Sequence, residues 1–197
     1  MRKVYGVGVN NFHGAISLNG VHIREYKIWT EMLRRCYSIG IKVNRPSYTN
    51  CIVDDWLLDF SNFYKFARDQ IGFFDRDSNG KSFHLDKDIL GNGKLYSTET
   101  ICFIPPEINA FKTNRKSTKG EYPIGVLFHK ASGKLISQIT VNSTKKYLGV
   151  FDNPYDAFSA YKVEKEKQSK FLAEKYKPVI DPRVYQALID YEVNIDD

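Results

Sequence analysis

The chain has 197 residues, of which 42% are hydrophobic and 14% aromatic, so its composition excludes a disordered or fibrous protein and allows one large or two small globular domains. Its formal net charge of +6 and isoelectric point of about 9.1 favour a partner of negative charge. No apolar run approaches the roughly 18 residues of a membrane span, and residues 1–20 lack the apolar core of a secretion signal. We therefore expect a cytoplasmic protein without a membrane partner.

Two helices are predicted early in the chain. Residues 1–20 are rich in Gly and Asn, which is typical of a short strand pair or an arm, and apolar residues then recur at three- and four-residue spacing from Arg24 onward. The apolar face of this first helix comprises Tyr26, Trp29, Met32, Leu33 and Cys36. A second helix is expected from Val53 to about Gln70. Its buried side chains are expected to be Trp56, Phe60, Phe63 and either Phe66 or Ala67.

The segment 82–109 predicts two strands followed by a short helix. Residues 82–90 have strand character, Gly91-Asn92-Gly93 is a turn sequence, and a return strand begins at 94–96. Pro105-Pro106 introduces the helix, because proline suits the first helical turn. The segment is therefore expected to fold as strand, turn, strand and helix.

A sheet and a long helix are predicted in the C-terminal part, after a hydrophilic segment at 116–122 that is the best linker candidate. Three short strands are expected at 124–129, 134–141 and 145–151. Asn153-Pro154 is an N-cap followed by proline, so a helix begins there and is expected to continue towards Tyr176. A short amphipathic helix closes the chain.

Positive charge is concentrated in one segment. From Phe111 to Val150 there are eight Lys or Arg residues and one acid, Glu121, whereas the chain after Ile180 carries five acids and only Arg183 as a base. A polyanion is therefore expected to contact segment 111–150.

The three cysteines, Cys36, Cys51 and Cys102, form no CxxC pair. They fit buried thiols in a reducing compartment. A zinc site that combines them with His84 remains an alternative, although no spacing signature supports it.

The C-terminal part resembles an AP2/ERF DNA-binding domain. The residues that carry this resemblance are Gly125-Val126, Ser132-Gly133-Lys134, Tyr147-Leu148-Gly149-Val150-Phe151, Asp156-Ala157 and Ala160-Tyr161. The resemblance implies that a three-stranded sheet enters the major groove of double-stranded DNA, with a helix packed behind it. The groove-facing side chains would be Leu127, His129, Gln138, Thr140, Lys145 and Tyr147. Leu127 and Thr140 stand where that family usually has arginines, so the same base specificity is not expected.

The DNA-binding residues expected from this resemblance and from the basic segment form a wider set. They are Arg115, Lys116, His129, Lys130, Lys134, Gln138, Thr140, Lys145, Lys146 and Tyr147. Gln138 and the lysines of this set can reach base edges or phosphates, and contacts from the lysines to the DNA backbone are expected to dominate.

The N-terminal part resembles HNH-type (His-Me finger) endonucleases of phages and mobile elements, which include homing enzymes and act in the cytoplasm of the bacterial host. The residues that carry this resemblance are Tyr26, Trp29, Met32, Arg35-Cys36-Tyr37, Val53, Trp56, Phe60, Asn62-Phe63, the run His84-Leu85-Asp86-Lys87-Asp88, Tyr96-Ser97 and Glu99-Thr100. It implies a ββα-metal finger that hydrolyses phosphodiester bonds in DNA.

The metal ligands implied by this resemblance are Asp86 on the first strand and Asn109 on the helix, and their oxygens suit Mg²⁺ or Mn²⁺. His84, Asp86 and Asp88 alternate along the strand, so all three are expected on one face. The catalytic set would then be His84, Asp86, Lys87, Asp88 and Asn109. The family's base histidine after the strand aspartate is replaced by Lys87, which leaves His84 as a candidate base and Lys87 as a phosphate contact.

The expected fold class is α+β, with an N-terminal helical region and a ββα-metal finger, then an AP2-like three-stranded antiparallel sheet and helix. The expected domains are a nuclease domain at 1–115 with its finger at about 82–112, a linker at 116–122, a DNA-binding domain at 123–178, and a short helix with an acidic tail at 179–197. The expected function is a metal-dependent DNA endonuclease. The alternative is a non-catalytic DNA-binding protein with a degenerate finger, such as a regulator or an antagonist of host defence. An RNA-binding protein is less well supported, because the sheet lacks a pair of stacking aromatics.

Overall fold

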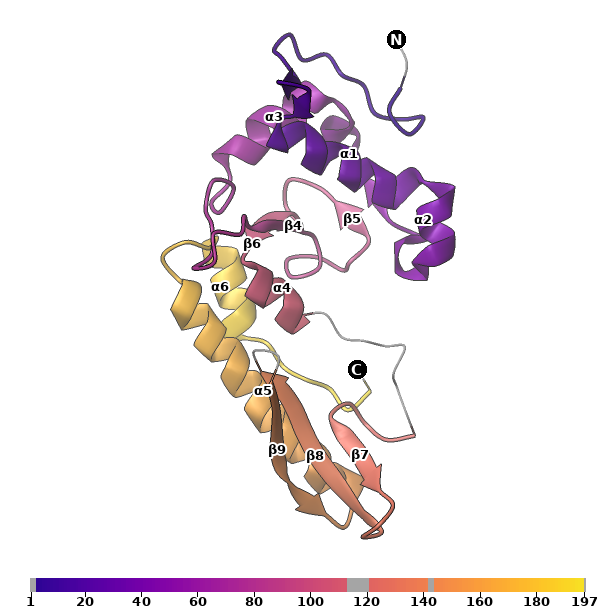
Figure 1. Cartoon of the computed structure of the whole chain (residues 1–197), viewed down its shortest axis with the longest axis vertical. Helices are drawn as coiled ribbons and strands as arrows, with labels where there is room; N and C mark the ends of the chain where they lie inside the picture. The colour runs from indigo at the N-terminus through magenta and orange to yellow at the C-terminus, as the bar shows by residue number, and fades with distance from the viewer. Residues whose placement is uncertain (1–2, 113–120, 142–143, 197) are drawn as a thin grey trace. The chain divides into compact units, whose positions relative to one another are not determined.

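The computed structural model describes residues 3–112, 121–141 and 144–196, which contain both helices and short strands (Figure 1). This confirms the mixed α and β class and the three-stranded antiparallel sheet. The chain divides into two compact units, which we call unit 1 (Met1–Pro106 with Val179–Val184) and unit 2 (Glu107–Pro178 with Tyr185–Asp197). In the described part of the chain, no helix is both long and apolar enough to cross a membrane.

Helix α1 (Arg24–Tyr37) forms as the spacing of apolar residues predicts, and it organises unit 1. Its side chains at Trp29, Met32, Leu33 and Cys36 are buried. The indole nitrogen of Trp29 donates a hydrogen bond of 2.9 Å to the carbonyl of Leu57, and its ring lies 5.3 Å from that of Phe60. These contacts fasten α1 to the segment that follows Val53.

The single helix predicted from Val53 to Gln70 is wrong, because two aspartates divide it. Asp54 caps the short 3₁₀ helix η2 (Asp55–Leu58) by accepting from the Trp56 backbone, and Asp59 caps α3 (Phe60–Asp69) by accepting from the Ser61 backbone. Trp56, expected in the core, is 48% exposed as a result. Two further helices, α2 (Ile39–Asn44) and η1 (Pro46–Tyr48), were not predicted.

The strands of unit 1 form three separate pairs. An antiparallel hairpin joins β1 (Ser17–Leu18) to β2 (Val21–His22), and β3 (Ile52–Val53) pairs in parallel with β5 (Leu95–Tyr96). Strand β4 (His84–Asp86) pairs antiparallel with β6 (Cys102–Ile104). The predicted hairpin between 82–90 and 94–96 is therefore wrong, because the return strand lies further along the chain.

Asp86 explains why β4 ends early. Its Oδ1 accepts the backbone N–H groups of Asp88 and Ile89, at 2.9 and 2.8 Å, which turns the chain out of the strand direction. Strand β6 leads into α4 (Pro106–Lys112), as the Pro105-Pro106 pair predicts. The chain order is therefore β4, β5, β6 and α4, in which β4 pairs with β6 while β5 pairs with β3.

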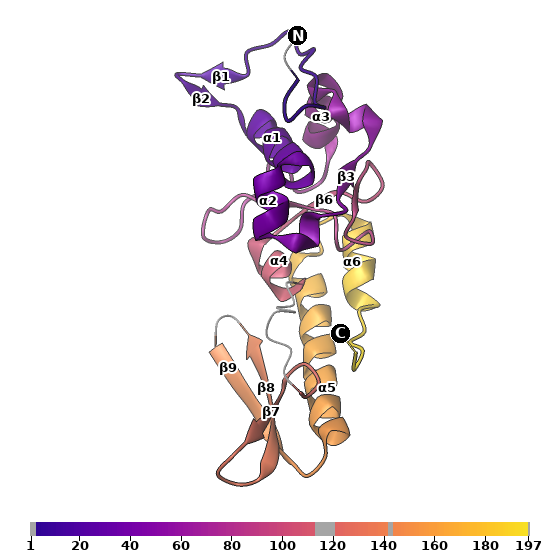
Figure 2. The ribbon, with the colours of Figure 1, turned by 90° about the vertical axis from the view of Figure 1, so that its right-hand side faces the viewer.

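Unit 2 consists of a sheet covered on one side by a long helix (Figure 2). The strands are β7 (Val126–His129), β8 (Lys134–Val141) and β9 (Thr144–Phe151), within two residues of their predicted bounds, and β8 lies in the centre. Helix α5 (Pro154–Tyr176) begins at Asn153, whose side chain accepts the backbone N–H of Asp156 at 2.9 Å. Helix α6 (Pro182–Ile189) follows.

The core of unit 2 forms between α5 and one face of the sheet. Its buried residues are Val126, Leu135, Ile139, Ala157, Phe158, Tyr161 and Val193. Burying such a set supplies most of the stabilisation, at about 25 cal/mol per Å² of apolar surface. The C-terminal segment takes part through Val193, whose carbonyl accepts from the ammonium of Lys162 at 2.9 Å.

The closest approach in this core is at Gly125, just before β7. Its φ of +81° lies in the left-handed region, and a Cβ placed there would lie only 2.0 Å from the ring of Tyr161 on α5. Only glycine lets the sheet and the helix meet this closely.

We expect Gly125→Ala to destabilise unit 2 more than Gly133→Ala does. Both positions have positive φ, which costs about 1–2 kcal/mol for alanine. Only Gly125 adds overpacking, at about 1–3 kcal/mol, because a Cβ at Gly133 meets nothing within 4 Å. Chemical denaturation of the two variants measures this difference, and equal losses would contradict the close contact with Tyr161.

Candidate nucleic-acid interface

The face of the unit 2 sheet that is turned away from α5 forms a continuous surface, which we call the open face. On the central strand, Leu135, Ser137 and Ile139 are buried towards the helix, so the alternate residues point the other way. Residues directly paired across an antiparallel sheet share a face, so the register identifies the rest of the open face. It comprises Leu127, His129, Lys134, Ile136, Gln138, Thr140, Lys145, Tyr147 and Val150.

An apolar row crosses all three strands of the open face. Leu127 pairs with Ile136, and Ile136 pairs with Val150. Leu127 is 50% exposed and Val150 47%, and Ile136 between them is half-buried. A row of branched aliphatic side chains therefore faces outward in the middle of a basic segment.

Polar residues lie in rows on either side of the apolar row. In the row next to the apolar row, which we call the amide row after the Gln138 side chain, Gln138 pairs with Tyr147. In the row beyond it, Thr140 pairs with Lys145. On the other side, His129 pairs with Lys134 beside the β7–β8 turn. The open face thus has a basic residue near each end and uncharged residues in its middle.

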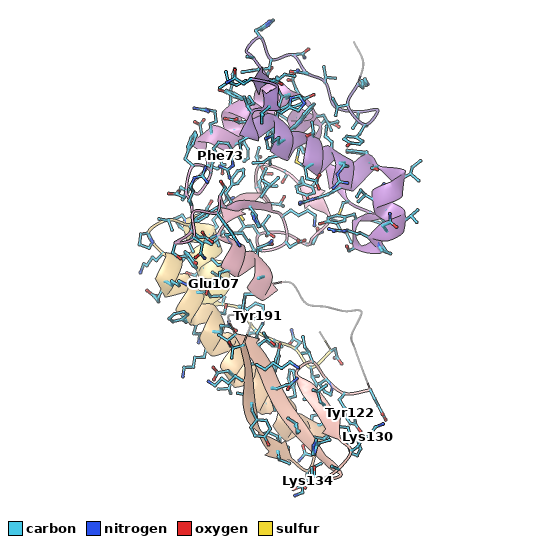
Figure 3. The ribbon with its side chains drawn as sticks, viewed as in Figure 1. Phe73, Glu107, Tyr122, Lys130, Lys134 and Tyr191 are labelled. Carbon is cyan, nitrogen blue, oxygen red and sulfur yellow. The ribbon has the colours of Figure 1, made fainter. Side chains whose placement is uncertain are left out.

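The lysines around the β7–β8 turn lie at one end of the sheet, where Figure 3 labels Lys130 and Lys134. Lys134 forms an ion pair of 3.0 Å with Asp152, and both side chains are well exposed. Such an exposed pair is weak, so Lys134 can exchange it for another anion. The ring of His129 is hydrogen-bonded to the hydroxyl of Ser132 at 2.8 Å.

Of the residues predicted to contact DNA, the structure brings most together. His129, Lys134, Gln138, Thr140, Lys145 and Tyr147 all lie on the open face, and Lys130 lies in the adjoining turn. Lys146 does not: it pairs with Ile139 on the helix-covered face, and its ammonium lies 2.7 Å from Glu164 of α5. Arg115 and Lys116 lie outside the described residues, as does most of the predicted linker.

Two residues of the open face, Ile136 and Val150, were missed by the sequence prediction. Ile136 could have been found from its alternation with Leu135. Val150 could not, because a β-bulge in β9 interrupts the alternation: Ser137 pairs with Gly149 but Gln138 pairs with Tyr147, which leaves Leu148 as the extra residue. Strict alternation from Lys145 would have placed Val150 on the helix-covered face.

The residues predicted for the finger lie in both units. His84, Asp86, Lys87 and Asp88 belong to unit 1, whereas Asn109 lies half-buried on α4 in unit 2. Asp86 is buried at 6% exposure, and burial raises the pKa of its carboxyl group. His84 is exposed, and partial burial followed by the charges of Arg35 and Arg24 lowers the pKa of its imidazole.

Lys87 and Asp88 are paired with each other. The Lys87 side chain is 4% exposed, its Nζ lies 2.7 Å from Asp88 Oδ1, and it sits over the rings of Tyr48 and Tyr96 at 5.6 and 5.4 Å. Asp88 stands beyond the end of β4, so its expected place on the strand face beside Asp86 is wrong. The reason is the turn that Asp86 builds.

These contacts occupy one carboxylate oxygen of Asp86 and one of Asp88. Asp86 Oδ1 is engaged by two backbone N–H groups, and Asp88 is engaged by Lys87. Among residues 3–112, 121–141 and 144–196, no three His, Cys, Asp or Glu side chains are grouped to hold a metal ion.

The three cysteines are buried and free, which confirms their expected burial. Burial is the largest cause that raises the pKa of each thiol, to about 12 in the case of Cys36. The thiols of Cys36, Cys51 and Cys102 are thus held in their protonated form at neutral pH.

No family model, curated protein or solved structure matches this chain. The resemblances to AP2/ERF domains and to HNH-type endonucleases therefore stay predictions, and they rest on the residues that carry them. The open face and the Asp86 turn are the two features of the described chain on which a function can be argued.

We expect Asp86→Asn to be as stable as the native chain at acidic pH and more stable at neutral pH, and Asp86→Ala to lose stability. An amide oxygen can accept the same two N–H groups, whereas alanine leaves them unpaired at a loss of about 1–3 kcal/mol. Because the folded-state pKa of Asp86 is raised, its stabilising contribution is present below the unfolded pKa and is lost as the pH rises through the folded value. The asparagine amide does not ionise, so the Asp86→Asn variant does not lose this stability as the pH rises. Urea titrations of both variants at acidic and neutral pH measure these effects, and a destabilised Asp86→Asn would contradict the turn role.

Proposed function

We propose that unit 2 binds double-stranded DNA through the open face of its sheet. The observation that supports this proposal best is the gathering of Lys134, Gln138 and Lys145 on one exposed face. Their alternation with buried residues of the same strands means that the sheet can use them without disturbing its core.

The size of the sheet suits the major groove. Neighbouring strands lie about 4.8 Å apart, so a row across three strands is about 10 Å wide. The major groove is about 12 Å wide and admits an α-helix or a two-stranded β-ribbon, so a row of about 10 Å lies within its width. The narrower minor groove, at about 6 Å, does not admit three strands.

Charge supports the same partner. In the described residues between Glu121 and Val150 the only acid is Glu121, which precedes β7, while Lys130, Lys134 and Lys145 are exposed. Phosphate contacts by lysines supply affinity that does not depend on sequence, and they position the sheet for contacts to bases.

We expect Lys145→Ala to weaken DNA binding and to reduce the slope of log K against log salt by about one, as loss of one phosphate contact does. Lys146→Ala is the matched control, since it removes the same charge from the neighbouring position on the helix-covered face, where Glu164 already binds it. Fluorescence anisotropy over a range of salt concentrations measures both slopes. Equal slopes for the two variants would exclude the open face as the DNA-binding surface.

DNA cleavage by the finger is a second candidate function. The observation in its favour is the chain order of β4, antiparallel β6 and then α4, which is the order that the resemblance implies. The engaged carboxylate of Asp86 and the ion pair between buried Lys87 and exposed Asp88 favour binding without cleavage. The assignment of Asn109 as a second ligand and of Mg²⁺ or Mn²⁺ as a cofactor stays a prediction.

We expect supercoiled plasmid incubated with the protein and Mg²⁺ or Mn²⁺ to remain uncut, while it is retarded on a gel. If nicking is seen, Asp86→Asn decides its origin, because this variant keeps the fold and changes one carboxylate oxygen to an amide nitrogen. Nicking by the native chain that disappears in Asp86→Asn would contradict binding without cleavage and support the second candidate function.

A further inference from the structure

The open face carries more apolar surface than phosphate binding needs. Its centre is the apolar row of Leu127, Ile136 and Val150, and Tyr147 in the next row is 59% exposed. Exposed and half-buried aliphatic side chains at paired positions across three strands indicate an apolar group on the partner. Lysines at the ends of the same face indicate that this partner also carries negative charge.

The major groove of DNA, a negatively charged partner, presents one apolar group. The 5-methyl group of thymine projects there, whereas the edges of guanine, cytosine and adenine present hydrogen-bonding groups. Placing an aliphatic row against those polar edges would leave them without partners at a loss of free energy. The apolar row therefore favours thymine over the other bases.

The neighbouring amide row points to the same base pair. Gln138 lies one row away from Ile136, with its side chain half-buried beside Tyr147. A glutamine amide can pair with N6 and N7 of adenine through two hydrogen bonds. Successive rows are about 6.7 Å apart along the strands, close to two steps of about 3.4 Å along DNA.

We propose that the open face selects A·T-rich DNA, with Leu127, Ile136 and Val150 in contact with thymine methyl groups and Gln138 bonded to an adenine about two base pairs away. The inference rests on the proposed DNA binding and specifies which bases the face recognises. The residues at the ends of the face, Lys134 and Lys145, contribute affinity and no base preference.

Removal of the methyl group tests this directly. Fluorescence anisotropy at one fixed salt concentration measures binding of the full chain to three short duplexes. The first has alternating A and T, the second has deoxyuridine in place of thymidine, and the third has alternating G and C. We expect the thymine duplex to bind more tightly than the uracil duplex by about fourfold for each methyl group contacted, the equivalent of burying one such group. The G·C duplex should bind most weakly.

Variants on the open face assign the contact. Leu127→Ala and Val150→Ala should bring the thymine-to-uracil ratio towards one. Val163→Ala is the matched control, because Val163 is also an exposed valine, at 67%, but lies on α5. Gln138→Ala should keep the thymine-to-uracil ratio and lose preference for A·T over G·C by about fivefold or more.

The outcomes separate the inference from the function on which it rests. Equal binding of the thymine and uracil duplexes by the native chain, with clear binding to both, overturns the methyl contact and leaves DNA binding in place. A ratio that survives in Leu127→Ala and Val150→Ala overturns the assignment to the apolar row. Failure to bind any duplex overturns the proposed function itself.

Discussion

The packing of α5 against one face of the β7–β8–β9 sheet is the constraint on which the candidate interface depends. Leu135 and Ile139 of the central strand are buried against the helix, and the absence of a side chain at Gly125 lets Tyr161 approach the sheet. Because paired residues of neighbouring strands share a face, burial on β8 determines which residues of β7 and β9 are exposed. The composition of the open face is thus a consequence of core formation.

In unit 1, by contrast, the buried charged side chains near the end of β4 are already paired with hydrogen-bond donors or a counter-ion. Asp86 is buried and accepts two backbone N–H groups, and Lys87 is buried against aromatic rings with Asp88 as its counter-ion. Charged groups that are already paired at short range contribute to the stability of a turn. They are less available to a metal ion or a phosphate than exposed groups of the same type.

The open face combines weak electrostatic contacts with an apolar centre. Its lysines are few, and Lys134 already has a partner in Asp152, so under the proposed function charge would supply a modest and salt-dependent part of the affinity for DNA. Apolar contacts and the Gln138 amide are much less sensitive to salt. The balance favours a surface that discriminates among bases over one that merely attracts any polyanion.

The sequence by itself determined the elements whose signals are local. The apolar spacing of α1, the cap at Asn153 and the three strands of unit 2 could all be predicted, because periodicity and capping depend on near neighbours. The positions of Gln138, Thr140 and Lys145 on one face were implied by the resemblance to AP2/ERF domains. Only the tertiary structure decided which strand pairs with β4, that Lys146 lies on the helix-covered face of the sheet, and that Val150 lies on the open face. Strand pairing depends on residues far apart in the chain, and a bulge at Leu148 reverses the facing of the residues that follow it, so neither leaves a periodic signal in the sequence.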